Sequence, residues 1–162
     1  MTIFFSIGTN LGEREENLRT AVQLLHERVG ECLACSSVYR SAPQGFVSDN
    51  EFANIVAVCE TDHSPEEVLL ITQQIEREMG RTQKSVNGIY HDRVIDIDLL
   101  KATHHSSLIV RNSKTLTLPH PRMQERDFVM IPLREVEEII TTTGACTDLQ
   151  SEGRSTAQRS TN

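Results

Sequence analysis

Two aspartates in a short apolar segment are the residues of this sequence best suited to chemistry. Val94–Leu100 reads Val-Ile-Asp-Ile-Asp-Leu-Leu, and its alternation places Asp96 and Asp98 on one face of a predicted strand. Neighbouring carboxylates on a partly buried surface repel each other and lose hydration, and a divalent cation relieves both costs. Carboxylates that leave positions for water and phosphate are typical Mg²⁺ ligands. We therefore expect a magnesium site, and the simpler alternative is a solvated strand face.

A rigid histidine segment is the second candidate. It reads Leu-Pro-His-Pro-Arg over Leu118–Arg122 and is followed by Arg126-Asp-Phe128. The prolines on both sides of His120 stiffen the backbone and exclude a helix there. Arginine binds phosphate through paired hydrogen bonds and a fixed histidine adds a donor, so the segment indicates an anion site. Taken alone, a surface turn with solvated charges is the commoner explanation.

Three cations precede the aspartate strand. Arg81 and Lys84 lie in a polar stretch without an apolar period, Gly80–Asp92, and Arg93 adjoins the strand. In an acidic protein, cations beside a candidate magnesium site indicate a polyphosphate ligand. The sequence contains no Gly-x-x-x-x-Gly-Lys-Ser/Thr run, so the phosphates would have to be held by metal and side chains rather than by a P-loop.

A polar loop and the strand after it could bind a flat heterocycle. The loop is Arg40–Asn50, and Asn54 in the next strand offers donors and acceptors that suit an amide-like ring edge. Phe46, Phe52 and Phe128 could stack on such a ring. Each phenylalanine alone is more simply a core residue, so only the combination favours a ligand.

The apolar pattern predicts the elements that must position these residues. The predicted strands are Ile3–Ile7, Cys32–Tyr39, Phe52–Glu60, Val94–Leu100, Ser107–Val110 and Leu116–Leu118. The predicted helices are Arg14–Val29, a second that begins at Pro65 and ends at Gly80, and Ile131–Ile140. The order β-α-β-β-α-β predicts an α+β fold, a ferredoxin-like two-layer sandwich with helices on one face of an antiparallel sheet. Residues 1–140 would form this domain, and the polar segment 141–162 a flexible tail.

The composition limits the function classes. A chain of 162 residues predicts one domain, and a net charge of −7 with 4% aromatic residues argues against nucleic acid as a partner. The apolar runs are too short to span a membrane, and no basic segment precedes the N-terminal apolar residues as it would in a signal peptide. We therefore expect a cytoplasmic globular protein.

The cysteines raise a separate question. Four cysteines are too few for a disulfide scaffold, although Cys32 and Cys35 match Cys-x-x-Cys. In a regular strand, residues three apart face opposite sides, and a zinc site would need a second pair. We expect ordinary reduced cysteines.

Six segments between Ile3 and Val136 together form a specific pattern. They are Ser6-Ile-Gly-Thr-Asn10-Leu, Ser37-Val-Tyr39-Arg-Ser-Ala-Pro43, Phe52-Ala-Asn54, Ile75-Glu76 with Gly80-Arg81, Arg93-Val-Ile-Asp96-Ile-Asp98-Leu-Leu, and Leu118-Pro-His120-Pro-Arg with Arg126-Asp-Phe128. In this order they resemble the 6-hydroxymethyl-7,8-dihydropterin pyrophosphokinase family. The resemblance implies a ferredoxin-like core and transfer of pyrophosphate from ATP to the pterin hydroxymethyl group, with release of AMP.

The resemblance also implies roles for individual residues. It assigns two Mg²⁺ ions to Asp96 and Asp98, and catalytic charge to Arg81, Arg93, His120 and Arg126. It assigns ATP binding to Gln73, Glu76, Lys84, Arg93, Leu99, Thr117, His120 and Arg126. It assigns pterin binding to Ser41, Pro43, Gly45, Phe52, Asn54, Asp96 and Phe128. The implied partners are small molecules only, and we expect a monomer.

Three other functions remain as alternatives. A glycosyltransferase with an Asp-x-Asp metal site would leave the loop segments unexplained, and the chain is short for it. An RNA-binding module of the same topology is disfavoured by the acidic charge. A non-catalytic relative is disfavoured because Asp96, Asp98, His120 and Arg126 are all present. Product analysis separates these possibilities, because only the pyrophosphokinase releases AMP.

Overall fold

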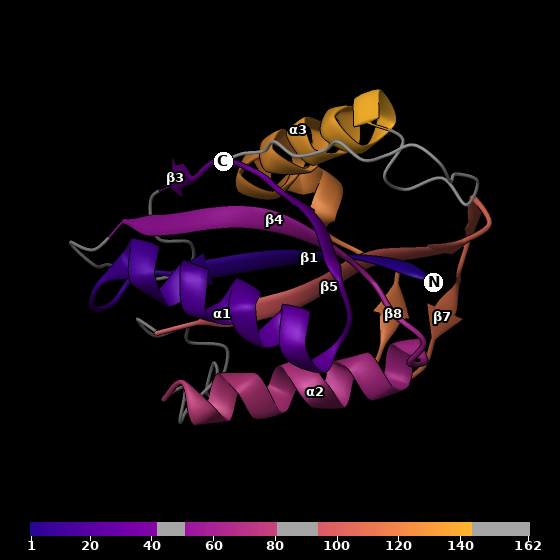
Figure 1. The fold of residues 1–162 in the computed structure, drawn as a ribbon, viewed down its shortest axis with the longest axis horizontal. Helices are drawn as coiled ribbons and strands as arrows, with labels where there is room; N and C mark the ends of the chain where they lie inside the picture. The colour runs from indigo at the N-terminus through magenta and orange to yellow at the C-terminus, as the bar shows by residue number, and fades with distance from the viewer. Residues whose placement is uncertain (42–50, 81–93, 144–162) are drawn as a thin grey trace.

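The computed structural model describes residues 1–41, 51–80 and 94–143, and in these ranges an antiparallel sheet lies between helices (Figure 1). The sheet contains β1 (Thr2–Thr9), β2 (Cys32–Cys35), β3 (Tyr39–Ser41), β4 (Phe52–Glu60), β5 (Asp96–His104) and β6 (Ser107–Leu108). A separate hairpin pairs β7 (Arg111–Asn112) with β8 (Thr117–Leu118). The helices are α1 (Arg14–Arg28), α2 (Pro65–Glu78), the 3₁₀ turn η1 (Met123–Glu125) and α3 (Asp127–Thr143).

The strand order confirms the predicted ferredoxin-like topology. The sheet runs β2-β4-β1-β5-β6, with β3 also paired to β4. β1 is central because both β4 and β5 pair with it in antiparallel register over nearly its full length. Two helical crossovers, α1 and α2, therefore connect strands that are not neighbours, which is the split β-α-β arrangement expected from the sequence.

Local sequence signals fix where α2 begins. Ser64 is its N-cap: the Ser64 Oγ accepts from the Glu67 backbone N–H at 3.1 Å, and the Glu67 Oε1 accepts from the Ser64 N–H at 2.8 Å. Pro65 takes the first helical position, where its missing N–H costs nothing. This capping box confirms the predicted start of the second helix.

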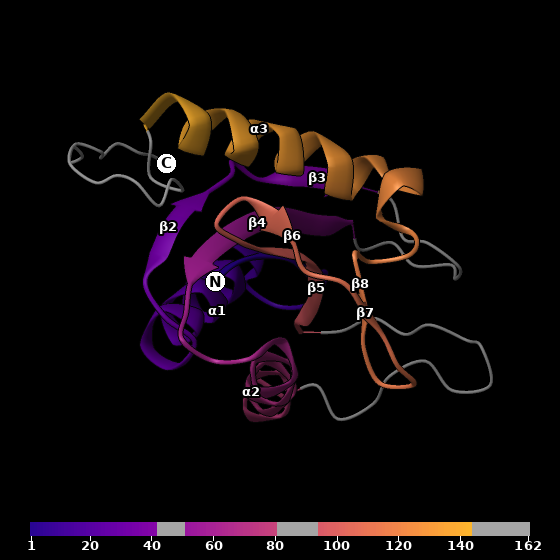
Figure 2. The same ribbon diagram turned by 90° about the vertical axis from the view of Figure 1, so that its right-hand side faces the viewer.

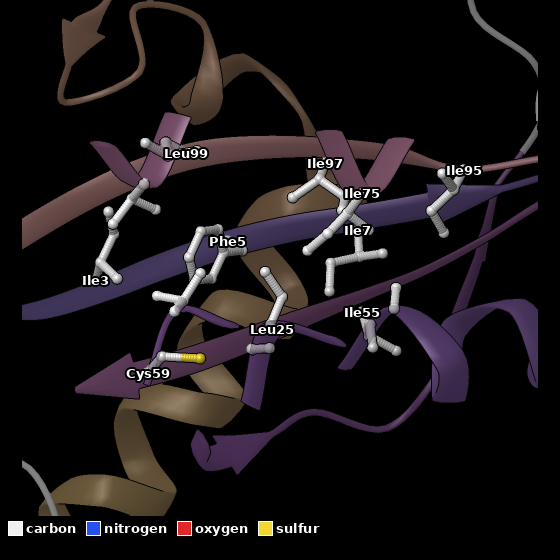
Figure 3. Close-up of a cluster of buried hydrophobic side chains, with 14 of the residues drawn as sticks. Ile3, Phe5, Ile7, Leu25, Ile55, Cys59, Ile75, Ile95, Ile97 and Leu99 are labelled. Carbon is white, nitrogen blue, oxygen red and sulfur yellow. The ribbon is translucent and has the colours of Figure 1, made fainter. Parts of the chain in front are cut away.

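Both faces of the sheet are covered. α1 and α2 pack on one face over a core that includes Ile3, Phe5, Ile7, Leu25, Ile55, Ile75 and Ile97 (Figures 2 and 3). On the other face, α3 packs through Val129, Leu133, Val136 and Ile140 against Phe4, Val56, Val58 and Leu100. The prediction of helices on one face therefore holds for α1 and α2 and is wrong for α3. The central strands are buried along almost their whole length because α3 adds this further layer.

Element boundaries differ from prediction where tertiary contacts intervene. The strand predicted at Cys32–Tyr39 is split into β2 and β3, because the Ser36 Oγ accepts the Val56 N–H and Ser37 bonds to Glu135 of α3. β5 runs further than predicted, because Lys101–His104 pairs with β1 or β6. α3 begins four residues before the predicted start, with the Arg126 carbonyl accepting from Val129 and Met130.

The cysteine geometry also differs from prediction. A register shift between Cys32 and Ala34 interrupts the alternation of β2. Cys32 and Cys35 therefore pack against the same core cluster, rather than facing opposite sides. The predicted opposite facing of the two cysteines is wrong, because a bulge adds a residue to one strand and changes the side on which the following residues lie.

Several predictions lie outside the described residues. The loops predicted at Arg40–Asn50 and Gly80–Asp92 fall largely within 42–50 and 81–93, and the tail falls within 144–162 apart from the end of α3. The domain boundary at residue 140 therefore stays a prediction. Among the described helices, none is long and apolar enough to cross a membrane.

Candidate active site

Three strands bring the candidate residues together on the α3 side of the sheet. In the pairing register, Gly8 of β1 lies opposite Asn54 of β4 on one side and opposite Asp96 of β5 on the other. The adjacent row on the same face pairs Ser6 with Asp98. Neighbouring strands are about 4.8 Å apart, so the backbones of Asn54 and Asp96 are separated by roughly 10 Å across Gly8. The amide and the two carboxylates thus share one end of one sheet face.

The two aspartates alternate with core residues, as predicted. Asp96 and Asp98 are partly buried, and Ile97 and Leu99 point into the core. The strand is held from the α2 side, where the buried Glu76 accepts the Ile97 backbone N–H through Oε2 at 2.7 Å. A rigid backbone under the two carboxylates fixes their spacing.

The donor set suits magnesium better than a transition metal. Two partly buried carboxylates on one strand face are hard oxygen ligands, and Mg²⁺ keeps several water or phosphate ligands beside one or two such carboxylates. Within residues 1–41, 51–80 and 94–143, no group of three or more His, Cys, Asp and Glu side chains is arranged to hold a metal. Asp96 and Asp98 are thus the residues of the described part of the chain that could hold such an ion.

His120 is fixed beside the aspartate strand. Its backbone N–H donates to the Leu100 carbonyl at 2.7 Å, after a cis Leu118–Pro119 bond. Its Nδ1 accepts the Arg122 backbone N–H at 3.1 Å, which leaves Nε2 to carry the proton of the neutral ring. Burial lowers the His120 pKa, and the positive charge of Arg126 lowers it further, against an opposing effect of Asp96. At neutral pH, His120 is therefore a neutral Nε2–H donor.

Arg126 and Phe128 stand at the start of α3. Arg126 ends the η1 turn, and its backbone N–H donates to the Met123 carbonyl at 3.2 Å. Its guanidinium lies 5.8 Å from the centre of the Phe128 ring, and both side chains are partly buried. A cation near the electron-rich ring face is stabilised there, so the charge and the aromatic surface are held together.

Asn54 is oriented by its neighbours. Its side chain is 3% exposed, and its Nδ2 donates to the Ser41 Oγ at 2.9 Å and to the Tyr39 carbonyl at 3.2 Å. Both acceptors belong to β3, so the amide direction depends on the β3–β4 pairing. With both Nδ2 bonds directed to β3, the Oδ1 faces β1 as an acceptor.

The residues predicted to line ATP are more dispersed. Gln73 and Glu76 lie on α2, Leu99 is a buried core residue of β5, and Thr117 is exposed on β8. The Glu76 carboxylate accepts the Ile97 backbone N–H, a contact that the sequence did not predict. Five predicted site residues lie outside the described ranges: Pro43, Gly45, Arg81, Lys84 and Arg93.

The sequence predicted no role for Gly8, which lies in the first of the six matching segments. The available signal was an isolated glycine inside an apolar strand, which indicates a close approach of another group. The structure contains that approach: a Cβ at Gly8 would lie 2.8 Å from the Asn54 Oδ1 and 3.6 Å from the Phe52 ring.

Comparisons with known proteins give a family and named relatives. A family described as 7,8-dihydro-6-hydroxymethylpterin-pyrophosphokinase matches residues 4–138. A Porphyromonas gingivalis protein named 2-amino-4-hydroxy-6-hydroxymethyldihydropteridine pyrophosphokinase is 47% identical over 134 residues, which are 83% of this chain and 89% of the relative. A Bacillus subtilis protein of the same name is 34% identical over 151 residues, or 93% and 86% of the two chains.

A solved structure supports the fold independently of close sequence similarity. It is described as HPPK-DHPS in complex with substrates, and it matches with a TM-score of 0.62 at 14% identity. The match covers 83% of this chain and 40% of the solved chain. At this identity the likeness concerns the fold alone.

Proposed function

This chain belongs to the 7,8-dihydro-6-hydroxymethylpterin pyrophosphokinase family and is a pyrophosphokinase of folate synthesis, and from this premise we propose how its own residues carry the transfer. The reaction moves pyrophosphate from ATP to the hydroxymethyl group of 6-hydroxymethyl-7,8-dihydropterin and releases AMP. The observation that supports the residue assignment is the row Asn54–Gly8–Asp96, in which the amide that we assign to the pterin and the carboxylate that we assign to the metal lie on either side of Gly8.

The pterin binds at the β3–β4 end of that row. The Asn54 amide, oriented by Ser41, reads the polar edge of the ring. Phe52 and Phe128 come from β4 and α3, and they would enclose the ring between two aromatic surfaces. In this pose the hydroxymethyl group extends across Gly8 toward Asp96.

ATP binds at the β5 end with two Mg²⁺ ions held by Asp96 and Asp98. When bound, the metal neutralises negative charge on the transferred pyrophosphoryl group and on the leaving AMP. Both carboxylates face the same surface, so both can act on one polyphosphate chain.

His120 and Arg126 supply hydrogen bonds and charge to the phosphates. The neutral His120 ring donates through Nε2–H, because its Nδ1 accepts the Arg122 N–H and the ring proton is therefore on Nε2. Arg126 adds a positive charge, and its stabilising effect on the phosphates increases as the bond to AMP breaks. Arg81, Lys84 and Arg93 would add further charge. No side chain is needed as a strong base, since positioning and charge dominate phosphoryl transfer.

The decisive experiment follows the nucleotide product. The chain is mixed with ATP, Mg²⁺ and 6-hydroxymethyl-7,8-dihydropterin, and nucleotides are separated by chromatography. We expect pterin-dependent AMP, lost by at least about a hundredfold in Asp96→Asn and Asp98→Asn. Asp62→Asn, an exposed aspartate in the β4–α2 connection, is the matched control and should keep full activity.

Two outcomes would contradict the proposal. ADP as the product would mean a different group is transferred. Full activity in both Asp96→Asn and Asp98→Asn would remove the metal assignment. The monomeric state and the cytoplasmic location remain predictions from the sequence, and sedimentation of the purified chain tests the first of them.

A further inference from the structure

Cys32 of β2 and Cys59 of β4 lie directly opposite each other on two neighbouring strands. The β2–β4 register pairs Cys32 with Cys59, and the Glu60 N–H donates to the Glu31 carbonyl at 2.9 Å beside them. In an antiparallel ladder this bond pattern makes Cys32 and Cys59 a non-hydrogen-bonded pair, in which the Cα atoms are about 4.5 Å apart. That separation lies within the range of disulfides, about 4.4–6.8 Å.

The two thiols differ in access. Cys59 is fully buried in the cluster under α1 (Figure 3), whereas Cys32 is partly exposed on β2, at the edge of the sheet. Of the two residues only Cys32 has exposed surface, so Cys32 is the one that a small oxidant from solvent meets first. We propose that Cys32 and Cys59 form a reversible disulfide site for hydroperoxides, with Cys32 as the attacking thiol and Cys59 as the resolving thiol.

The electrostatics agree with this division. The Cys59 thiol, hydrogen-bonded to the Cys32 sulfur, lowers the Cys32 pKa and so favours its thiolate. The same hydrogen bond raises the Cys59 pKa, which keeps Cys59 protonated. An accessible cysteine of lowered pKa beside a second thiol is the usual arrangement of an oxidisable pair.

Cys35 is not part of the pair. It packs against the same cluster but lies opposite Ala57 in the register, so it has no cross-strand thiol partner. Burial raises the Cys35 pKa to about 12, so its thiolate is scarce at neutral pH. The pairing register, rather than the Cys-x-x-Cys spacing, decides which thiols join.

The chemistry balances with hydrogen peroxide as oxidant. The Cys32 thiolate attacks one peroxide oxygen and the O–O bond breaks, which gives Cys32 sulfenic acid and hydroxide. The Cys59 sulfur then attacks the Cys32 sulfur and displaces the hydroxyl, with loss of the Cys59 proton. In total, two thiols lose two hydrogen atoms and one peroxide becomes two waters.

The disulfide would join the edge strand β2 covalently to β4 and would not involve residues of the candidate active site. Cys59 is five residues from Asn54 along β4 and packs on the α1 side, whereas the candidate site lies on the α3 side. The Cys32–Cys59 link therefore involves none of the residues that we assign to catalysis. The oxidised chain should keep its AMP-forming activity within about twofold.

Peptide mapping after peroxide treatment tests the proposal. Trypsin leaves Cys32 and Cys35 in residues 29–40, Cys59 in residues 41–77, and Cys146 in residues 135–154. Treating the folded wild-type chain with hydrogen peroxide should link 29–40 to 41–77 with loss of two hydrogens, and dithiothreitol should reverse the link. The matched control Cys35→Ser should give the same link.

Trapping separates the two steps. In Cys59→Ala, peroxide should leave Cys32 as a sulfenic acid that dimedone captures, and Cys32→Ala should give no link. A disulfide within 29–40, a link to 135–154, loss of the link in Cys35→Ser, or an unlinked Cys32 under peroxide would each overturn the proposal. The wild-type and Cys35→Ser maps decide the question even if an alanine variant fails to fold.

Discussion

Gly8 and Asn54 face each other so closely that a Cβ on Gly8 would lie 2.8 Å from the Asn54 Oδ1. Real Cβ atoms do not approach an oxygen that closely, so the amide can hold its position only opposite a glycine. The Asn54 Nδ2 is bonded to the Ser41 Oγ and the Tyr39 carbonyl, and a displaced amide would break both bonds. Gly8 thus acts as a positioning residue for the amide that we assign to the pterin.

Gly8→Ala should therefore weaken pterin binding selectively. Overpacking by one methyl group costs about 1–3 kcal/mol, which corresponds to roughly a 5- to 150-fold rise in the pterin KM or Kd. The ATP KM should change little, because the phosphates bind at the Asp96 end of the row. Steady-state kinetics with each substrate varied in turn, and pterin titration calorimetry, measure the two effects.

Two companion variants show whether the effect acts through Asn54. In an Asn54→Ala background the conflict is absent, so adding Gly8→Ala should cause no further loss of pterin affinity. Ile7→Val, on the opposite face of β1, should lower stability by about 0.5–1.5 kcal/mol without a change in either KM. Equal rises of both KM values in Gly8→Ala would argue against this role for Gly8.

The sequence predicted the features that depend on local signals. The predicted strand Phe52–Glu60 has the observed bounds, because its residues are apolar apart from Asn54 and Glu60. The start of α2 at Pro65 followed from the capping box, and the shared face of Asp96 and Asp98 followed from strand periodicity. Each of these needs information from a few neighbouring residues only.

Features that depend on distant partners were missed. The break between β2 and β3 depends on Ser37 bonding to Glu135, 98 residues later in the chain. The role of Gly8 depends on the register that brings Asn54 opposite it. The bulge that turns Cys32 and Cys35 to one face likewise arises from pairing with β4. Periodicity within one segment contains none of this information.

His120 should make the stability of the chain depend on pH in a defined direction. Burial and Arg126 lower its folded-state pKa below the ordinary 6.5, so the unfolded chain takes up a proton before the folded chain does. The free energy of unfolding should therefore fall as pH drops through 6.5 toward the lowered folded-state pKa. Urea unfolding between pH 8 and pH 5 measures this slope.

A substitution isolates the histidine contribution. Asn at position 120 keeps an acceptor for the Arg122 N–H and removes the titrating ring, so His120→Asn should flatten the slope between pH 6.5 and pH 5. His104→Asn, at an exposed hairpin position, should leave the slope unchanged. A wild-type slope that survives His120→Asn would mean that another group is responsible.

Glu135 should hold α3 to the segment that leads into β3. Its Oε2 accepts the Ser37 backbone N–H at 3.0 Å and its Oε1 accepts the Ser37 Oγ hydroxyl at 2.8 Å. Glu135→Ala should lower the free energy of unfolding by about 1–3 kcal/mol. It should also raise the pterin KM, because the Ser37 segment leads into β3, where Ser41 accepts from Asn54. Glu138→Ala, an exposed position on the same helix, is the control. If thermal melts and substrate kinetics gave the same results for Glu135→Ala and Glu138→Ala, this role of Glu135 would be wrong.

Arg28 and Glu78 should tie α1 to α2 in a manner that acid removes. The Arg28 guanidinium donates to both Glu78 oxygens, at 3.0 and 2.7 Å. The Arg28 hydrogen bonds, with help from Gln74, lower the Glu78 pKa to about 2 from its ordinary 4.5. Because the folded-state pKa is the lower one, the stabilisation is fully present above pH 4.5 and is lost as pH falls toward 2.

Glu78→Gln should therefore melt at a lower temperature than the wild type at pH 7, and this difference should shrink between pH 4.5 and pH 2. The Arg28 and Glu78 side chains are 36% and 42% exposed, so the difference should be small and should decrease further in high salt. Glu16→Gln, which breaks an exposed pair with Arg19 within α1, should change the melting temperature less at pH 7. Because the ion pair joins two helices rather than two turns of one helix, its loss should also loosen α2 against α1. A melting difference that stays constant from pH 7 down to pH 2 would show that packing, rather than the Glu78 charge, stabilises this contact.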